Sequence, residues 1–421
     1  MYLNRQSRVS FSWPKCDTAE NSRQLTAPIG PLILLNMAKE TTLIAGQQSW
    51  KQETAAVDAA LTVNGAMLAP VRFTLPGGTV VEPYYVNPWH SEDLSRIEPE
   101  LLRPLRGDFF CLPFGGNNTV GDETHPPHGE AACAPWQRRD GSDAEGTITV
   151  ELNYSSCPGS VVRQVELGKT APWIVSRTTV RGFSGDYPLG YHATLKGGEV
   201  DGLWKIYTAN FDIGMTEPAH ADPTAGGEYY ALQPGAVFDS LEAVPTRWKD
   251  PATTDCSIFP ARDGFIDILA LYRRRSATQP LSERLVWTAA VHQQDGYLWY
   301  SIKDAAVLPA TVFWMENRGR HGAPWSGRNS CIGIEETCTF FAAGRSKSIE
   351  ENVINSQGIA TATALSPDTP TTIASVQGVL KVEDPTSPIR SMHLDEGGRP
   401  VFTDAQERTM TVELDVRTAF S

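Results

Sequence analysis

The residues best suited to chemistry are concentrated in one irregular stretch, residues 106–136. It reads RGDFFCLPFGGNNTVGDETHPPHGEAACAPW and combines an arginine, two histidines, aromatic side chains and several glycines and prolines. The stretch has neither a strand nor a helix period, which is typical of a loop that forms a site between strands. The alternative is an irregular surface loop in which His125 and His128 are solvated.

Metal binding is the first chemistry that two close histidines suggest. His125 and His128 form an H-x-x-H arrangement, and Cys133 follows five residues later. Zinc sites more often use a histidine pair one helical turn apart or a C-x-x-C pair, and Pro126-Pro127 prevents a helix here. The sequence therefore predicts no metal site, and no motif in it predicts another cofactor.

Acid–base chemistry is the second possibility, and it uses residues outside this stretch. His192 lies in GYHATLKGG, where the alternative is a hydrogen-bonded core histidine. The segment CIGIEETCTFF has the pattern of a strand, so the adjacent Glu335 and Glu336 must point to opposite faces. One of them must face inward or into a cleft, and an inward carboxylate needs a partner or a function. Motifs for serine hydrolases, nucleotide binding and dinucleotide binding are absent from the sequence, which leaves acid–base work by histidine and glutamate, or no catalysis.

The elements that would position these residues are short strands. Residues 147–154 and 409–417 alternate apolar and polar side chains with a period of two, which predicts strands with one buried face. Further strands are predicted at 161–167, 173–181, 284–291 and 297–303. A short helical signal has capping-box spacing at Ser348 and Glu351 and can end at Gly358.

Glycine pairs divide the chain into many such short segments, which favours an all-β fold. We expect one large antiparallel β-sandwich with few short helices. Residues 1–36 lack any sustained period and are expected to form an irregular N-terminal tail. Residues 37–421 are expected to form a single domain.

Composition and charge exclude several classes of function. The 421 residues include 36 Lys+Arg and 49 Asp+Glu, a formal net charge of −13, and no basic run that would attract nucleic acid. The apolar residues 31–35 are far fewer than the ~18 of a membrane span, and residues 1–30 lack the pattern of an export signal. The seven cysteines are spread too widely for a disulfide framework. We expect a cytoplasmic monomer or homodimer that binds neither nucleic acid nor a membrane.

Several motifs together resemble a known family. Arg106-Gly107, Cys111, Pro113-Phe114-Gly115 and His128-Gly129, followed by Trp136, are similar to the R-G-G-I-P-x-C-x-P-x-F-G…H-G-F-A-R…W stretch of hexose-6-phosphate 1-epimerases. These enzymes belong to the galactose mutarotase-like (aldose 1-epimerase) superfamily. In the same order, residues 60–73 resemble its opening strands, Tyr191-His192 its second histidine, residues 232–245 its Pro-Gly segment and residues 331–335 the strand with its glutamate.

The resemblance implies a β-supersandwich that binds a small sugar in a cleft on its concave sheet. In that family a glutamate removes the proton of the anomeric hydroxyl while a histidine protonates the ring oxygen, and the opened ring recloses as the other anomer. A histidine near its ordinary pKa of ~6.5 and a glutamate whose pKa is raised by burial suit these roles at neutral pH. By position Glu335 would be the base and His192 the acid, and His128 would contact a sugar hydroxyl and share the acid function. The other sugar contacts implied are Arg106, Trp89 or Trp136 as a stacking face, His125, and Asp212 as the orienting aspartate.

The sequence departs from the family at the phosphate contact. Where H-G-F-A-R is typical, the chain has His128-Gly129-Glu130-Ala131-Ala132, so an alanine replaces the arginine and a carboxylate appears. Both changes disfavour a dianion, and we expect a neutral or cationic sugar instead of a hexose phosphate. Two alternatives stay open. One is a carbohydrate-binding protein of the same fold without turnover. The other is a lyase or glycosidase-associated module, which would need a second carboxylate facing Glu335.

Overall fold

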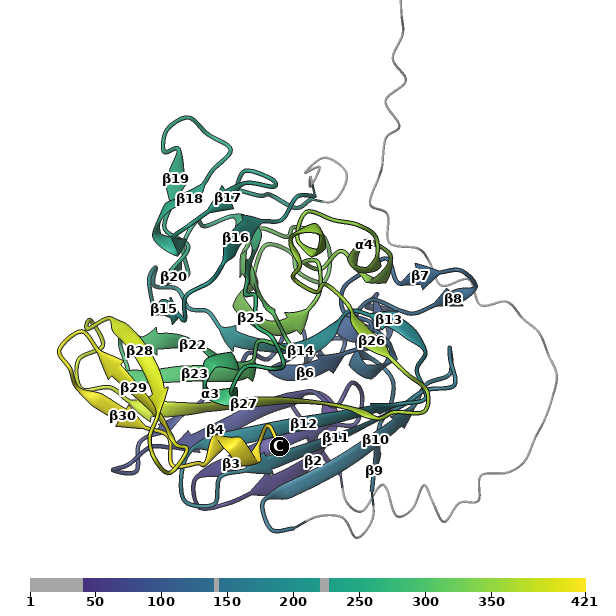
Figure 1. The fold of residues 1–421 in the computed structure, drawn as a ribbon, viewed down its shortest axis with the longest axis horizontal. Coiled ribbons are helices and arrows are strands. Elements are labelled where there is room, and N and C mark those ends of the chain that lie inside the picture. Colours follow the sequence, from purple (N-terminus) through teal and green to yellow (C-terminus); the bar gives the residue numbers. More distant parts are fainter. Residues whose placement is uncertain (1–40, 140–143, 220–226) are drawn as a thin grey trace, which may run out of the picture.

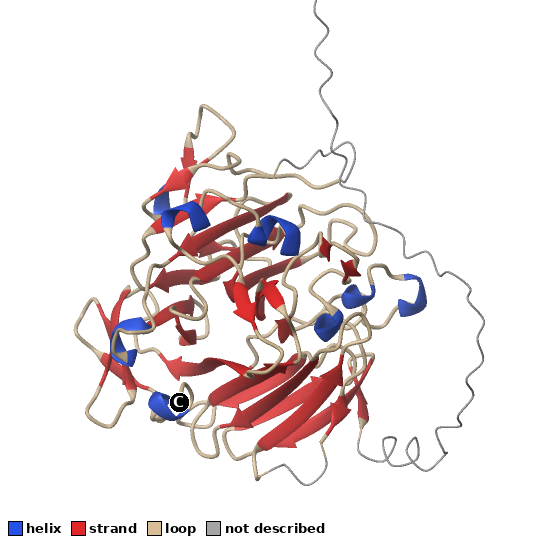
Figure 2. Ribbon diagram, turned by 45° about the vertical axis from the view of Figure 1, so that its right-hand side comes forward, coloured by secondary structure: helices blue, strands red, loops and turns tan. Residues whose placement is uncertain are grey.

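Two large antiparallel sheets make up most of the chain that the computed structural model describes, residues 41–139, 144–219 and 227–421 (Figures 1 and 2). The predicted tail, residues 1–36, lies outside the described residues. The first sheet has twelve strands, in the order β1 (Thr42–Ile44), β2 (Gln47–Glu53), β3 (Val57–Thr62), β4 (Leu68–Thr74), β6 (Asp108–Cys111), β14 (Leu189–Lys196), β25 (Ser330–Cys338), β24 (Ala310–Asn317), β21 (Phe265–Tyr272), β16 (Ile213–Thr216) and β17 (Val237–Phe238), with β5 (Val80–Val81) beside β4.

The second sheet has nine strands, in the order β20 (Ile258–Phe259), β15 (Trp204–Thr208), β22 (Leu285–His292), β23 (Tyr297–Asp304), β27 (Thr371–Lys381), β12 (Trp173–Arg181), β11 (Ser160–Leu167), β10 (Thr147–Asn153) and β9 (Gln137–Arg138). Four small sheets complete the described strands: β28 (Ile389–Leu394) with β29 (Pro400–Asp404) and β30 (Thr409–Thr411), β13 (Gly185–Tyr187) with β26 (Thr363–Leu365), β18 (Val244–Pro245) with β19 (Thr253–Thr254), and β7 (Thr119–Val120) with β8 (Glu123–Thr124). Two short α-helices are described, α3 (Leu281–Arg284) and α4 (Arg345–Ile349). The all-β prediction is confirmed.

The main hydrophobic core lies between the two large sheets. One cluster of buried side chains joins Phe110 and Phe313 of the twelve-stranded sheet to Val161 and Trp299 of the nine-stranded sheet. Successive strand residues point to opposite faces, so Phe109, the neighbour of Phe110, belongs to a different cluster. We call the face of the twelve-stranded sheet that carries Phe109, turned away from the nine-stranded sheet, the site face.

The site face is covered as well. Its cluster includes Leu101 and Leu102 from a 3₁₀ turn before β6, and Phe341, Ile354 and Ile359 from the segment that follows β25. The central strands of this sheet are therefore buried on both sides. This explains why β24 and β25 are buried almost throughout and do not alternate between buried and exposed residues.

Two buried ion pairs connect the large sheets. Asp108 of β6 accepts from Arg163 of β11 at 2.5 Å, and Glu336 of β25 contacts Lys303 of β23, also at 2.5 Å. Burial raises the pKa of Asp108 and lowers that of Lys303 to about 8. Because both charges of each pair are desolvated, losing one partner leaves an uncompensated charge and typically costs about 3–5 kcal/mol.

The five strands predicted before residue 304 coincide, within a residue or two, with β10, β11, β12, β22 and β23. The C-terminal prediction over 409–417 is wrong beyond Thr411. There the Asp415 carboxylate accepts hydrogen bonds from the backbone and side chain of Arg417 and closes a 3₁₀ turn, Val416–Thr418. Such local bonds compete with strand pairing.

The predicted helix also begins at a different place. Helix α4 ends at Ile349, where the prediction began, and Ser348 does not cap a helix: its hydroxyl accepts a hydrogen bond from the Phe340 N–H at 3.1 Å. Gly358 does end a turn, the 3₁₀ turn Asn355–Gln357, in the left-handed conformation at φ 79°.

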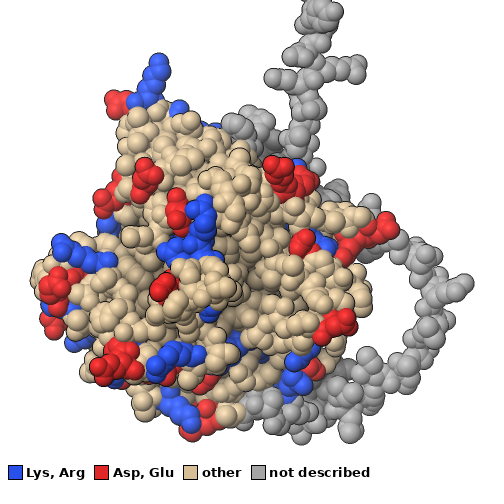
Figure 3. All heavy atoms as spheres, in the orientation of Figure 1, with Lys and Arg blue, Asp and Glu red and all other residues tan. Residues whose placement is uncertain are grey.

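Charges are mixed over the surface. In the view of Figure 3 basic and acidic side chains lie next to one another. Within the described ranges, no helix has the length and apolar character that a membrane crossing requires.

Candidate active site

His192 and Glu335 meet at the centre of the twelve-stranded sheet. They are direct partners in the ladder between β14 and β25, so their Cα atoms are opposite one another. His192 Nε2 lies 3.1 Å from Glu335 Oε1, and both residues are at most 5% exposed. The register of two neighbouring strands thus joins residues that are far apart in the sequence.

The two adjacent glutamates of β25 face different layers, as the strand pattern predicted. Glu336 points between the sheets to Lys303 and also accepts from Thr311 at 2.8 Å. Glu335 points to the site face and contacts His192 instead. Glu336 is therefore a structural partner, and Glu335 is the carboxylate that is available for chemistry.

His128 approaches the pair from the loop of residues 112–129. Its ring centroid is 5.3 Å from that of His192, and Phe114 packs edge-on against it at 4.8 Å. The Gly115 N–H donates to His128 Nδ1 at 3.4 Å, so the neutral ring carries its proton on Nε2. Gly129 has φ 76°, and a Cβ there would lie 1.7 Å from the Leu112 carbonyl oxygen, so only glycine permits this turn.

A glycine also makes room for the Glu335 carboxylate. A Cβ on Gly333, two residues before Glu335 on the same face, would lie 2.5 Å from Glu335 Oε1. It would also lie 3.1 Å from Trp314 Cβ on the paired strand β24. The Glu335 carboxylate therefore lies over Gly333, between His192 and Trp314.

Sequence reasoning missed a cation and two indole rings beside this pair. The Arg320 guanidinium lies over the rings of Trp314 and Trp325, at 5.4 and 4.9 Å. Trp314 packs edge-on against His192 at 5.8 Å. Trp325 and Arg320 belong to RGRHGAPWSGRN (318–329), which joins β24 to β25. That loop has the same mixture of arginine, histidine, tryptophan, glycine and proline that singled out residues 106–136, so the signal was present.

Burial dominates the protonation of the site. It raises the pKa of Glu335 well above its ordinary value, with Arg320 opposing. It lowers the pKa of His192 well below its ordinary value, and that of His128 to about 4, because a charged imidazole loses its hydration. The expectation of a histidine near pKa 6.5 is therefore wrong: both imidazoles are neutral at pH 7 in the unliganded protein.

Two further carboxylates lie on the site face. Glu316 follows Trp314 by two residues on β24, and Glu217 follows β16, where its N–H bonds to the Ile268 carbonyl. Burial raises the pKa of each to about 7. The cluster of His192, His128 and Glu335 thus has acidic neighbours. The nearby Arg320 is already paired with Glu228 at 2.9 Å and with Glu316 at 3.8 Å.

Three residues that the resemblance offered as sugar contacts are used elsewhere. Arg106 is fully buried and donates to the carbonyls of Pro104, Ile44 and Ala45. Trp136 lies in the core between the sheets and donates to the Ala131 carbonyl. Asp212 accepts from the Arg274 N–H at 2.7 Å. We leave these three out of the candidate site. Trp89 does reach its edge, because its ring packs against Trp325 at 4.9 Å.

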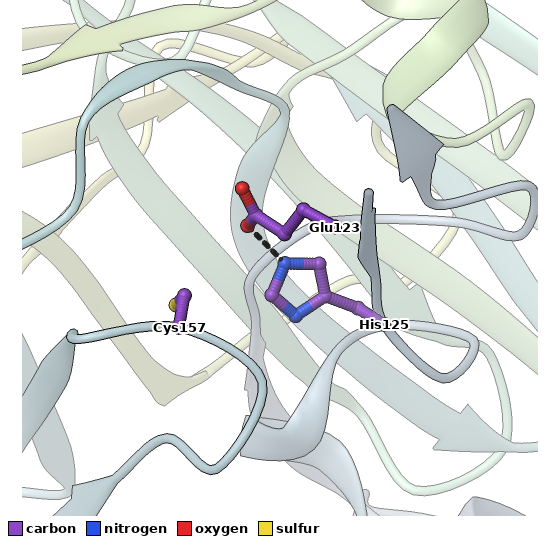
Figure 4. A group of neighbouring side chains, drawn as sticks. All are labelled: Glu123, His125 and Cys157. Carbon is purple, nitrogen blue, oxygen red and sulfur yellow. Dashed lines mark hydrogen bonds and ion pairs between the residues drawn. The ribbon is translucent and has the colours of Figure 1, made fainter. Parts of the chain in front are cut away.

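His125 belongs to a separate cluster (Figure 4). Its Nε2 lies 2.5 Å from Glu123 Oε1 and its Nδ1 lies 2.8 Å from Ser156 Oγ. Ligand atoms of Glu123, His125 and Cys157 are within 4.8 Å of one another, which would suit a metal. However, both imidazole nitrogens are hydrogen-bonded, and the Glu123 carboxylate also binds Tyr187 and Arg345. The hydrogen-bond network accounts for this cluster without a metal. His128 and Cys133 are not part of it.

Glu130, the acid at the expected phosphate contact, is held by two serines. Its carboxylate accepts four hydrogen bonds from the backbone and hydroxyl groups of Ser155 and Ser156. It therefore fixes the turn after β10. Arg320, the cation at the site, is compensated by Glu228 and Glu316.

The reacting pair itself is buried, whereas His128 is half-buried. Two pockets, each of about 370 Å³, lie elsewhere. Residues of β2 and of the loop at Arg103 line the first, and residues of β27, 55–56 and 74–76 line the second. Neither includes His192, Glu335 or His128. Trp314 packs against His192, and Trp325 packs in turn against Trp314 and Trp89.

Sequence comparison finds no matching family model and no matching curated protein. Solved structures match in fold. A candidate aldose 1-epimerase from Escherichia coli K12 is 11% identical and covers 79% of this chain and 99% of its own, with a TM-score of 0.51. A candidate mutarotase from Salmonella typhimurium is 12% identical and covers 83% and 99%, with a TM-score of 0.50. A galactose mutarotase-like protein from Lactobacillus casei is 15% identical and covers 79% and 99%, with a TM-score of 0.49.

At 11–12% identity the likeness to the first two structures concerns the fold and not the chemistry. The fold is the one that the motifs predicted from the sequence. The chain has the galactose mutarotase-like fold.

Proposed function

We propose that this protein interconverts the anomers of a neutral sugar, as aldose 1-epimerases do. The observation that carries the proposal is the contact of His192 with Glu335, with His128 beside it, on one buried face of the sheet. A carboxylate and an imidazole with pKa values shifted in opposite directions are what acid–base chemistry at a single carbon–oxygen centre needs.

The number of protons that Glu335 and His192 hold between them suits this reaction. With a cyclic sugar bound, Glu335 takes the proton of the anomeric hydroxyl while His192, as the imidazolium, protonates the ring oxygen and the ring bond breaks. The open-chain aldehyde then lies beside a protonated Glu335 and a neutral His192. Reclosure on the other face of the aldehyde reverses both transfers, so no proton is gained or lost.

Burial favours the protonation state of the open-chain stage, because it places the proton on Glu335 and leaves His192 neutral. The cyclic sugar therefore has to bind as the proton crosses to His192 over the 3.1 Å contact. His128, whose Nε2 carries a proton, donates a hydrogen bond to a sugar oxygen next to the reacting carbon. This assigns the base, the acid and one binding group.

The charges around the pair support a neutral substrate. Arg320 is the cation nearest the rings, and Glu228 and Glu316 already compensate it. Burial would lower its pKa, but these two carboxylates outweigh burial and raise that pKa. A phosphate dianion would therefore meet no uncompensated positive charge from Arg320.

Anomer exchange is the test of the proposal. Saturation-transfer NMR measures the exchange of α and β resonances of D-glucose, D-galactose and D-mannose with the protein present, against the spontaneous rate in the same buffer. The proposal requires exchange well above the spontaneous rate for at least one sugar. If a sugar binds but exchanges only at the spontaneous rate, the protein is a carbohydrate-binding protein of this fold instead.

A further inference from the structure

Two polar atoms on the site face of β24 make no hydrogen bond to any described residue. They are Trp314 Nε1, a donor, and Glu316 Oε2, an acceptor. Trp314 is 6% exposed and Glu316 is fully buried. Glu316 Oε1 accepts from the Arg320 N–H at 3.2 Å, but Oε2 is 3.8 Å from Arg320 Nε, which is too long for a hydrogen bond.

Such atoms are costly to leave without a partner. A buried donor or acceptor that has lost its hydration and gained nothing typically destabilises the fold by about 1–3 kcal/mol. Native proteins contain few of them, and each calls for an explanation such as a ligand contact. Here one donor and one acceptor occur two residues apart on one strand, so both side chains point to the same face.

The strand register places this pair beside the reacting groups. Trp314 is the ladder partner of Gly333, over which the Glu335 carboxylate lies, and Glu316 is the partner of Cys331. Trp314 also packs edge-on against His192. A sugar whose anomeric centre is at Glu335 and His192 would therefore extend its ring along β24 toward Trp314 and Glu316.

We propose that Trp314 and Glu316 form a hydroxyl-binding subsite that selects the sugar. A ring hydroxyl donates to Glu316 Oε2, and the same hydroxyl or its neighbour accepts from Trp314 Nε1. This inference rests on the proposed function and names the part of the substrate that the protein recognises. A hydroxyl group satisfies both atoms, whereas a hydrogen, a fluorine or a phosphate at that position leaves Glu316 without a donor or adds a like charge.

The rings around the subsite favour the same ligand. The indole of Trp314 and that of Trp325 offer apolar faces, which stack on the C–H face of a sugar while its hydroxyls reach polar atoms at the edge. Arg320 over both rings fixes their orientation. The subsite thus combines a fixed donor, a fixed acceptor and an apolar surface.

The test compares binding of D-glucose, D-galactose and D-mannose with binding of their monodeoxy derivatives, by calorimetry or NMR titration of the full chain. For the sugar that binds, removing the recognised hydroxyl should weaken binding about 10- to 100-fold, the range for leaving a buried polar atom without its hydrogen-bond partner. Glu316→Gln should weaken binding of the parent sugar by a similar factor, and Trp314→Phe should weaken it about 3- to 10-fold. Neither variant should weaken binding of the deoxy derivative further.

Glu228→Gln is the matched control, because Glu228 also pairs with Arg320 but its carboxylate is not one of the unpartnered groups. It should keep the discrimination between parent and deoxy sugar. Thermal melts of each variant show that it is folded.

Three results would overturn the inference. The first is that Glu316→Gln and Trp314→Phe both still discriminate fully between a sugar and its deoxy derivative. The second is that Glu228→Gln also loses this discrimination, and the third is that the parent protein binds none of the three sugars. The proposed function fails separately. If the variants lose discrimination as expected but the parent does not exchange anomers, the subsite stands and the epimerase activity does not.

Discussion

His192 and Glu335 are direct ladder partners on β14 and β25, and their side chains meet at 3.1 Å on the site face of the sheet. Because each residue sits in the middle of a long paired strand, the backbone fixes the separation of the two Cα atoms. The side chains have little freedom beside Phe109, which stacks on His192 at 4.5 Å. A rigid pair of this kind is suited to proton transfer over a short, constant distance.

Gly333→Ala should slow anomer exchange by at least tenfold without unfolding the protein. The added Cβ would lie 2.5 Å from Glu335 Oε1, so the carboxylate must move away from its present position. The exchange rate and a thermal melt together check this expectation. Gly322→Ala is the control, because no atom lies within 4 Å of a Cβ there, and it should exchange at the parent rate.

Glu217→Gln should stabilise the protein at pH 8.5 but not at pH 4. Burial raises the pKa of the folded Glu217 carboxyl from its ordinary 4.5 to about 7. The folded state therefore binds a proton more tightly than the unfolded state, so the contribution of this group favours folding at low pH and is lost as the pH rises through 7. The shift sets an upper bound of about 3 kcal/mol.

Thermal melts of parent and variant at both pH values measure this difference. A gain in melting temperature at pH 8.5 that disappears at pH 4 fits the prediction. An equal gain at both pH values would mean that the glutamine acts through packing and not through the proton.

Lys303→Met should destabilise the protein by about 3–5 kcal/mol, because it removes the buried cation that pairs with Glu336 between the sheets. The double variant Lys303→Met with Glu336→Gln should recover much of that lost stability, since it also removes the buried charge of the Glu336 carboxylate. Urea unfolding of both variants measures the two free energies of unfolding. Equal instability of the single and double variants would contradict the assignment of Glu336 as the structural partner.

Glucose 6-phosphate should bind no better than D-glucose. Arg320 is compensated by Glu228 and Glu316, and Ala132 stands where the resemblance to sugar-phosphate enzymes would place an arginine. Calorimetric titration with the two ligands under one set of salt conditions makes the comparison. A clear preference for the phosphate would show that a cation other than those described at the site contributes.

Much of the site follows from strand periodicity alone. The alternation of β25 predicts that Glu335 and Glu336 separate to opposite faces, and the structure confirms it. The pattern cannot tell which of the two faces the core between the sheets, because both sides of this sheet are covered. That outcome depends on Lys303, which lies on the other sheet.

Contacts between distant segments could not be predicted in the same way. Arg320, Trp314 and Trp325 approach His192 only because β24 and β25 are neighbours and their connecting loop folds back over the site. Conversely, His125 is close to His128 in the sequence, yet it bonds to Glu123 and Ser156 instead. His128 itself has φ 60°, a left-handed conformation that turns the chain at the second of the two histidines.

The most direct test of the central claim is the rate of anomer exchange in Glu335→Gln, measured by saturation-transfer NMR on the sugar that the parent protein exchanges. Glutamine keeps the size and hydrogen bonds of the side chain but cannot take the anomeric proton, so exchange should fall about 10²- to 10⁴-fold while sugar binding changes far less. The rate of anomer exchange in His192→Ala should fall by a comparable factor, because the ring oxygen then has no proton donor. Exchange at the parent rate in Glu335→Gln would contradict the assignment of Glu335 and His192 as the reacting pair.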